Sequence, residues 1–137
     1  MPRNMSFSMT TEAVRNRTKT VTRRLGWDFL RPGDVVCAVE KGMGLKKGEK
    51  VKRLGLIRVV SVQREPVWAI EDYADDCKRE GFPQLTAYDF VEMFCRANRC
   101  HEDDHCSRIE FEYVEDGREA VATGNAAGGT QGEGERG

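Results

Sequence analysis

A short basic segment holds the side chains best suited to chemistry. The stretch RTKTVTRRLGWDFLRPGDVV begins at Arg17 and brings cations and hydroxyls together at Lys19, Thr20, Thr22, Arg23 and Arg24. A desolvated lysine can lose its proton and act as a general base, and a threonine hydroxyl becomes a nucleophile when a base activates it. In a regular strand, Lys19 and Thr22 point to opposite faces, so they meet only if the chain turns or bulges between them. The alternative is a solvated segment with surface ion pairs.

Glu80 is the second candidate, because it continues the apolar side of a predicted helix. Ile70, Tyr73, Ala74 and Cys77 recur at the spacing of one helical face, and Glu80 falls on the same side near the C-terminal end. We therefore expect its carboxylate to point inward. The alternative is a residue of the last turn that has swung out to solvent.

Two further groups of residues are weaker candidates. The segment CRANRCHEDDHC suggests zinc, but its spacing matches no standard finger, and Cys95 lies on an apolar helix face that suits a buried thiol. We therefore expect no metal and no cofactor. The loop KKGEKVKR could contact phosphates through Lys46 and Lys47, although such a loop is more often only solvated.

The composition is that of one globular domain with an uneven charge distribution. Residues 1–65 carry 15 Lys and Arg against 6 Asp and Glu, and residues 66–137 carry 7 against 17. This indicates either a basic binding face or two parts that attract each other within the fold. The sequence contains no apolar run of membrane-spanning length and no secretory signal, so we expect a cytoplasmic protein with reduced cysteines.

The elements that must position these residues are strands with a few helices. Alternation predicts strands at 5–9, 35–39, 54–62 and 107–114, and a brief helix follows Thr10 or Thr11. Gly81 is placed to end the helix that carries Glu80, and Thr86 with Asp89 forms a capping box for the next helix. Residues 117–137 are rich in Gly and small side chains, which predicts a disordered tail after a domain spanning 1–116. The predicted fold class is α+β, with a small curved sheet and helices at its side. Pro66 should close the strand at 54–62, and the residues expected in the core are Ile57, Val59, Phe90, Phe94, Ile109 and Phe111.

Several segments together resemble one known family. TKTVTRR, LRPGDVV, LGLIRVVSV, REGFPQLTAYDFVEMF and RIEFEYV are similar to the ASCH domain, a PUA-like fold, and in particular to the small ASCH proteins of phages and prophages. The ASCH motif is Gly, any residue, Lys, two of any residue, Glu, any residue, Arg. Lys19 and Arg24 match it, whereas Arg17 stands at the glycine and Thr22 at the glutamate.

The resemblance implies a fold and two functions. The family implies a small β-barrel flanked by helices, with a cleft for RNA or a nucleoside lined by Lys19, Thr22 and Arg24. Trp27 would lie near this cleft as an apolar wall or stacking surface, and the alternative is that it fills the core. The threonine is shared with a bacterial subgroup that deacetylates acetylcytidine, which would make Lys19 the base, Thr22 the nucleophile and Glu80 the supporting carboxylate. We accordingly expect an RNA- or nucleoside-binding protein whose ligand contacts also include Arg17, Thr20, Arg23, Lys46 and Lys47. The alternative is an amidohydrolase that acts on an acylated cytidine.

Overall fold

The computed structural model describes residues 2–41 and 47–115 of the chain. Lys46 and the predicted Gly-rich tail at 117–137 lie outside these residues. Within the described ranges, no helix is long and apolar enough to cross a membrane.

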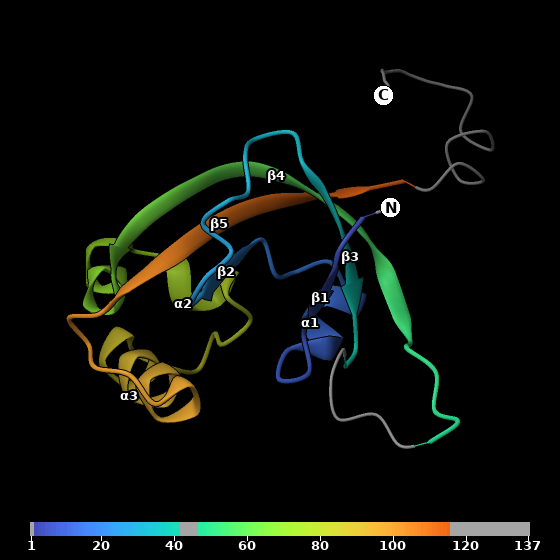
Figure 1. The fold of residues 1–137 in the computed structure, drawn as a ribbon. Coiled ribbons are helices and arrows are strands. Elements are labelled where there is room, and N and C mark those ends of the chain that lie inside the picture. Colours follow the sequence, from blue (N-terminus) through green and yellow to red (C-terminus); the bar gives the residue numbers. More distant parts are fainter. Residues whose placement is uncertain (1, 42–46, 116–137) are drawn as a thin grey trace.

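A curved five-stranded mixed sheet forms the frame of the molecule. Its strands are β1 (Asn4–Ser6), β2 (Val21–Arg24), β3 (Val35–Val39), β4 (Arg53–Pro66) and β5 (His105–Val114), in the spatial order β1-β3-β4-β5-β2. β1 pairs with β3 in parallel, and the other pairs are antiparallel. β4 and β5 run together as one long bent ribbon, with β1 and β3 towards one end of it and α3 (Ala87–Asn98) towards the other (Figure 1).

The sheet is open, which corrects the predicted barrel. β1 and β2 are its two edges, and no backbone ladder joins them within the described residues. These edge strands contain three and four residues, so neither is long enough to build an extended ladder across the gap. A side chain links them instead: Arg24 Nη2 on β2 donates to the Ser6 carbonyl on β1 at 2.5 Å. The α+β class is confirmed.

The prediction of one continuous amphipathic helix from Ile70 to Cys77 is wrong, because the helix is interrupted at Tyr73. The chain forms a 3-10 helix, η1 (Val67–Asp72), then an extended residue at Tyr73, and then a single turn, α2 (Asp76–Arg79). The break has a physical cause, because it lets two neighbouring side chains reach buried partners. The Tyr73 hydroxyl donates to Glu65 at 2.8 Å, and Asp76 accepts from Arg23 and Arg108. A continuous helix would display Ala74 on the buried face, but Ala74 is exposed.

The strand predicted at 5–9 ends early: β1 stops at Ser6, the chain turns so that the Thr10 N–H donates to the Phe7 carbonyl, and Met9 is exposed. Other local predictions are confirmed. α1 (Thr11–Arg15) is brief, Thr86 and Asp89 form the capping box of α3, and Pro66 ends β4 and precedes η1. Gly81 follows α2 with φ of +98°, the left-handed conformation that a helix-ending glycine adopts at little cost.

Two apolar clusters make up the core, and the predicted core residues are all buried. Ile57, Val59, Ile109 and Phe111 lie with Met5 and Phe7 in the first cluster, inside the curved sheet. Phe90 and Phe94 lie in the second, where α3 packs against η1 and Cys106. The helical layer is therefore attached to one end of the sheet by its own core.

Truncating Phe94 tests this attachment. Phe94→Ala should lower the free energy of unfolding by about 3–5 kcal/mol, because it removes a buried ring and leaves a cavity. Tyr88→Ala on the same helix is the control; Tyr88 is 65% exposed, so its loss should change stability by less than about 0.5 kcal/mol. Urea unfolding followed by circular dichroism measures both. Equal stabilities of the two variants would show that α3 does not depend on the second cluster.

Candidate functional site

A cavity of about 400 Å³ opens where the sheet fails to close. One side is formed by Ser6 and the segment that follows β1, and another by β2 and the residues just after it. Glu80 and Phe82, after α2, contribute to the wall, as do Phe90, Phe94 and neighbouring residues of α3. The cavity thus lies between the two apolar clusters and draws on segments far apart in sequence.

A buried ion pair lies on its wall. Lys19 Nζ donates to the backbone carbonyl of Glu80 at 2.5 Å and to Glu80 Oε1 at 3.0 Å. The two residues are 2% and 3% exposed. The ammonium also lies 5.9 Å from the ring centroid of Phe7 and 6.0 Å from that of Phe82, at the distances of cation–π contacts. One aromatic ring from each side of the cavity therefore flanks the charge.

The backbone around Lys19 is held by hydrogen bonds from both sides. Its N–H donates to the Ala13 carbonyl of α1 at 3.1 Å, and its carbonyl accepts from the Tyr113 hydroxyl of β5 at 2.5 Å. Gly81 brings the other partner close, since a Cβ there would lie 3.1 Å from Ala13 Cβ. Glycine is thus needed at 81 both for its φ and for the close approach of the turn after Glu80 to α1.

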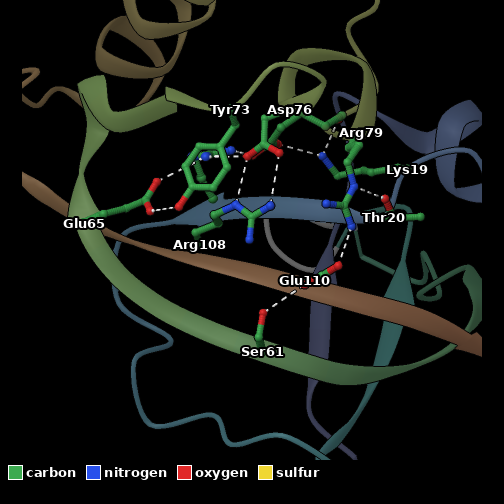
Figure 2. Close-up of polar contacts among 11 residues, drawn as sticks. Lys19, Thr20, Ser61, Glu65, Tyr73, Asp76, Arg79, Arg108 and Glu110 are labelled. Carbon is green, nitrogen blue, oxygen red and sulfur yellow. Dashed lines mark hydrogen bonds and ion pairs between the residues drawn. The ribbon is translucent and has the colours of Figure 1, made fainter. Parts of the chain in front are cut away.

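Arg23 joins this pair to a second set of buried charges. Its Nη1 donates to Glu80 Oε2 at 3.1 Å, and its Nη2 donates to Asp76 Oδ2 at 2.6 Å and Glu65 Oε2 at 3.1 Å. Arg108 donates to both carboxylate oxygens of Asp76, at 2.9 and 3.1 Å. Figure 2 shows Asp76 facing the guanidinium of Arg108, with the hydroxyl of Tyr73 on Glu65 beside them. Glu80 therefore has one oxygen bound to Lys19 and the other to Arg23, which fixes its orientation.

Burial shifts the pKa values of several charged side chains at the site. Desolvation is the largest influence on Lys19 and lowers its pKa, and the Glu80 carboxylate offsets only part of that effect. Desolvation also lowers the pKa of Arg24 to about 10, so Arg24 remains a cation at neutral pH. Burial by itself would raise the pKa of Asp76, but hydrogen bonds from Arg108 and Arg23 outweigh it and lower the pKa. Asp76 is consequently a stable counter-ion for two arginines.

Thr22 and Arg24 occupy the β2 side of the cavity. The Arg24 guanidinium donates through Nε to Thr22 Oγ1 at 3.2 Å and lies 4.6 Å from the Phe7 ring centroid. Its hydrogen-bond partners among the described residues are a hydroxyl and a carbonyl, and no described carboxylate forms an ion pair with it. Arg24 therefore supplies the wall with a positive charge that no carboxylate of residues 2–41 and 47–115 neutralises by direct contact.

Two non-glycine residues near the site have left-handed backbones. Arg17 has φ of +62°, in the left-handed region that glycine adopts most readily. Trp27, which lines the cavity, has φ of +61°. Such a conformation costs an L-residue roughly 1–2 kcal/mol, and bulky side chains rarely adopt it. The loop after β2 therefore presents the Trp27 ring at an energetic cost.

The structure gathers some of the candidate residues and separates others. Residues on the cavity wall are Lys19, Thr22, Arg23, Arg24, Trp27 and Glu80. Arg17 and Lys47 are exposed and do not line it. Thr20 does not line it either, because its hydroxyl accepts from Arg79 at 2.9 Å, in the group with Glu110 and Ser61 in Figure 2.

The cysteines and histidines of the segment 95–106 do not line the cavity, although Ala97 and Asn98 of the same segment do. His101 and His105 are exposed, whereas Cys106 is buried in the second cluster. Within the described residues, no three Cys, His, Asp or Glu side chains are arranged to hold a metal ion. Burial raises the pKa of Cys106 to about 12, as expected for a thiol that packs in a core.

Sequence reasoning missed much of the cavity wall. The segment Ser6–Thr10, Phe82 and the α3 residues Met93, Phe94, Ala97 and Asn98 all contribute to it. Phe94 was predicted only as a core residue, because an apolar helical stripe looks the same whether it faces a core or a cavity. Asp76 and Arg108, which orient the site through Arg23, carry no sequence signal that distinguishes them from surface charges.

Comparison with known proteins shows the fold. No family model and no curated protein matches the sequence. Among solved structures, the chain is similar to the hypothetical protein PH0355, with 13% identity and a TM-score of 0.58 over 83% of this chain and 100% of that one. It is also similar to protein EF3133 from Enterococcus faecalis, of family DUF984, with 17% identity and a TM-score of 0.55 over 93% and 86% of the two chains.

A further similar structure is an ASCH domain from Lactobacillus crispatus, with 13% identity and a TM-score of 0.48 over 81% and 79% of the two chains. The similarity to PH0355 and EF3133 shows a shared α+β fold. At these sequence identities it shows nothing beyond the fold.

Removing the Asp76 charge tests the buried network. Asp76→Asn should lower the free energy of unfolding by about 3–5 kcal/mol at pH 7, because Arg23 and Arg108 lose a shared buried counter-ion. The lowered pKa also predicts a pH dependence. The contribution of Asp76 is complete above its usual pKa of about 4 and is lost as the pH falls towards its lower folded pKa.

Urea unfolding between pH 7 and pH 3 measures both effects. The Asn variant should show a smaller loss of stability across the acid range than the original chain. Asp103→Asn, at a side chain 71% exposed, is the control and should leave both quantities unchanged. A variant at Asp76 that behaves like this control would rule out the network as a source of stability.

Proposed function

We propose that the protein binds a nucleoside, or one nucleotide unit of an RNA, in the cavity between β1 and β2. The observation that carries this proposal is a cavity of about 400 Å³ whose lining combines an oriented ion pair, a cation with no described carboxylate in direct contact, and aromatic side chains. Small-molecule sites are typically about 300–1,000 Å³ and combine apolar walls with a few placed polar groups. The cavity volume favours one small ligand over an extended partner.

The chemistry of the wall matches the groups of a nucleoside. Glu80 accepts and Lys19 donates hydrogen bonds, so together they suit the mixed donor and acceptor edge of a base. Phe7 and Phe82 offer aromatic surface beside these groups. Bases recognised by proteins are commonly held by such a combination of stacking and edge hydrogen bonds. The ASCH resemblance of the Lys19–Arg24 segment supports the same ligand class.

Arg24 gives the site a preference for an electron-rich group. No described carboxylate pairs with Arg24, so its guanidinium can donate to a carbonyl or phosphate oxygen of the ligand beside its bonds to Thr22 and Ser6. Lys19 and Arg23, in contrast, already have carboxylate partners. Arg24 is therefore the cation whose removal should affect binding most directly.

Binding should be measurable with simple nucleosides and nucleotides. Isothermal titration calorimetry should show saturable binding of at least one nucleoside or nucleotide. The probes are cytidine, N4-acetylcytidine, uridine, adenosine, guanosine and their 5′-monophosphates. Arg24→Gln should weaken the binding of that ligand about ten- to hundredfold, the effect of losing one charged hydrogen bond. Arg58→Gln is the control, because Arg58 lies on β4, pairs with Glu112 and does not line the cavity.

Thermal melts must show that both variants remain folded. Saturable binding with equal affinity in the Arg24 variant would remove Arg24 from the site. The absence of binding by any nucleoside or nucleotide would refute the proposed function.

One observation favours an amidohydrolase as a second candidate. Lys19 is a buried lysine with a lowered pKa, and Thr22 lies on the wall of the same cavity. In its neutral form Lys19 would accept the Thr22 proton while Thr22 Oγ attacks the acyl carbon of an acylated cytidine. The proton would then pass to the leaving amine, and water would release the acid from the threonine ester. The structure has Lys19 hydrogen-bonded to Glu80, and this favours binding over catalysis as the first proposal.

Catalysis can be separated from binding at Thr22. If N4-acetylcytidine is hydrolysed, Thr22→Val should abolish turnover while leaving ligand affinity within a few-fold, and Thr22→Ser, which keeps the hydroxyl, should retain part of the rate. Turnover should rise with pH through the lowered pKa of Lys19, since only the neutral amine accepts a proton. Release of cytidine, followed by mass spectrometry, measures these rates. Full activity in the Val variant would exclude Thr22 as the nucleophile.

A further inference from the structure

We propose that Trp27, Phe29 and Arg3 form a second subsite that stacks the nucleotide adjacent to the one in the cavity. The inference rests on the proposed function and extends it, because it makes single-stranded nucleic acid the preferred ligand over a free nucleoside. The set of three residues is called the stacking platform below.

The stacking platform is continuous with the cavity. Trp27 lines the cavity, and its ring lies 5.5 Å from the ring of Phe29, with 30° between the two planes. The guanidinium of Arg3 lies 4.9 Å from the Phe29 centroid. Phe29 is nevertheless 53% exposed, so this series of flat groups runs from the cavity wall to solvent.

The core does not require the platform in this form. Trp27 packs partly against the first apolar cluster, but Phe29 belongs to neither cluster. Gly26 and Trp27 both have left-handed backbones, and they are held there by hydrogen bonds. Ser107 Oγ donates to the Gly26 carbonyl at 2.9 Å, and Leu30 N–H donates to the Trp27 carbonyl at 3.3 Å. The loop thus holds Trp27 in a costly backbone conformation and leaves the Phe29 ring exposed to solvent.

The surroundings favour nucleic acid as the occupant. Aromatic rings and arginine planes stack any base, because every base has a π-face. Arg3 is an exposed member of the platform, and Arg24 lies on the neighbouring cavity wall with no carboxylate partner among the described residues. Two adjacent bases are joined by one phosphate, so cations next to both subsites match the charge of a dinucleotide. An apolar protein partner would gain nothing from these cations.

The test compares a ligand that fills one subsite with a ligand that fills both. The probes are the four common nucleosides and the four matching dinucleoside monophosphates, ApA, CpC, GpG and UpU. At least one dinucleoside monophosphate should bind about 5- to 150-fold more tightly than its nucleoside, the range expected for one stacked base. Phe29→Ala should remove most of this gain and leave the affinity for the nucleoside unchanged.

Two further variants sharpen the result. Tyr88→Ala removes another exposed aromatic side chain, from α3 outside the cavity wall, and should retain the full gain. The chain contains two tryptophans, so Trp68→Phe leaves Trp27 as the reporter, and stacking should quench its fluorescence more strongly with the dinucleoside monophosphate.

The outcomes distinguish this inference from the proposed function. If nucleosides bind but no dinucleoside monophosphate binds more tightly than its nucleoside, the stacking platform is overturned and the cavity assignment remains intact. If Phe29→Ala lowered the affinity for the nucleoside and for the dinucleoside monophosphate by the same factor, the stacking platform would also be overturned, because Phe29 would then only support the cavity. Failure of every nucleoside and dinucleoside monophosphate to bind would refute both proposals.

Discussion

The arrangement of the site depends on a balanced set of buried charges. Lys19, Arg23 and Arg108 face Glu65, Asp76 and Glu80, and all six side chains are largely removed from water. Burying an unpaired charge costs several kcal/mol, so each member can remain only while its partners stay in position. These residues come from β2, β4, β5, the segment before β2 and the region of α2. The ionic contacts therefore fix how the helical layer meets the sheet, and with it the shape of the cavity.

The same contacts explain two departures from regular structure. A continuous helix through Tyr73 would forgo the hydrogen bonds of Tyr73 and Asp76 to buried partners, so the chain breaks into η1 and α2. A closed barrel would need a backbone ladder between β1 and β2, where the molecule has instead the Arg24 link to Ser6 and the cavity beside it. The open edge lies at the cavity, and the helix break places Asp76 on Arg23, which in turn orients Glu80 on the cavity wall.

The uneven charge of the sequence has a partly internal explanation. Ion pairs such as Lys19–Glu80, Arg23–Asp76 and Arg58–Glu112 join the basic first part of the chain to its acidic second part. The buried pairs are coupled to the fold, whereas exposed pairs such as Arg58–Glu112 contribute little to stability. Some of the positive charge is thus used to hold the two parts together, and Arg24 is the cation on the cavity wall that is not used in this way.

The sequence by itself determined the elements that depend on local patterns. Alternating residues predicted β3 and β5, a capping box predicted the start of α3, and Gly81 was recognised as the end of the helix that carries Glu80. The buried residues Ile109, Phe111 and Phe94 followed from the same periodicities, since a repeat of 2 or 3.6 residues shows directly which face is apolar. The resemblance of the segment around Lys19 to ASCH proteins predicted a ligand site there, and this stays a prediction.

Only the tertiary structure decided which charges meet. Lys19 and Glu80 lie 61 residues apart, and no local pattern encodes that contact. Whether Glu80 faces Lys19 or solvent depends on the close approach of Gly81 to Ala13 and on the grip of Arg23. The roles of Asp76 and Arg108, the open edge of the sheet and the α3 wall of the cavity depend in the same way on packing between distant segments. A side chain's type is written in the sequence, but its burial and its partners are properties of the folded chain.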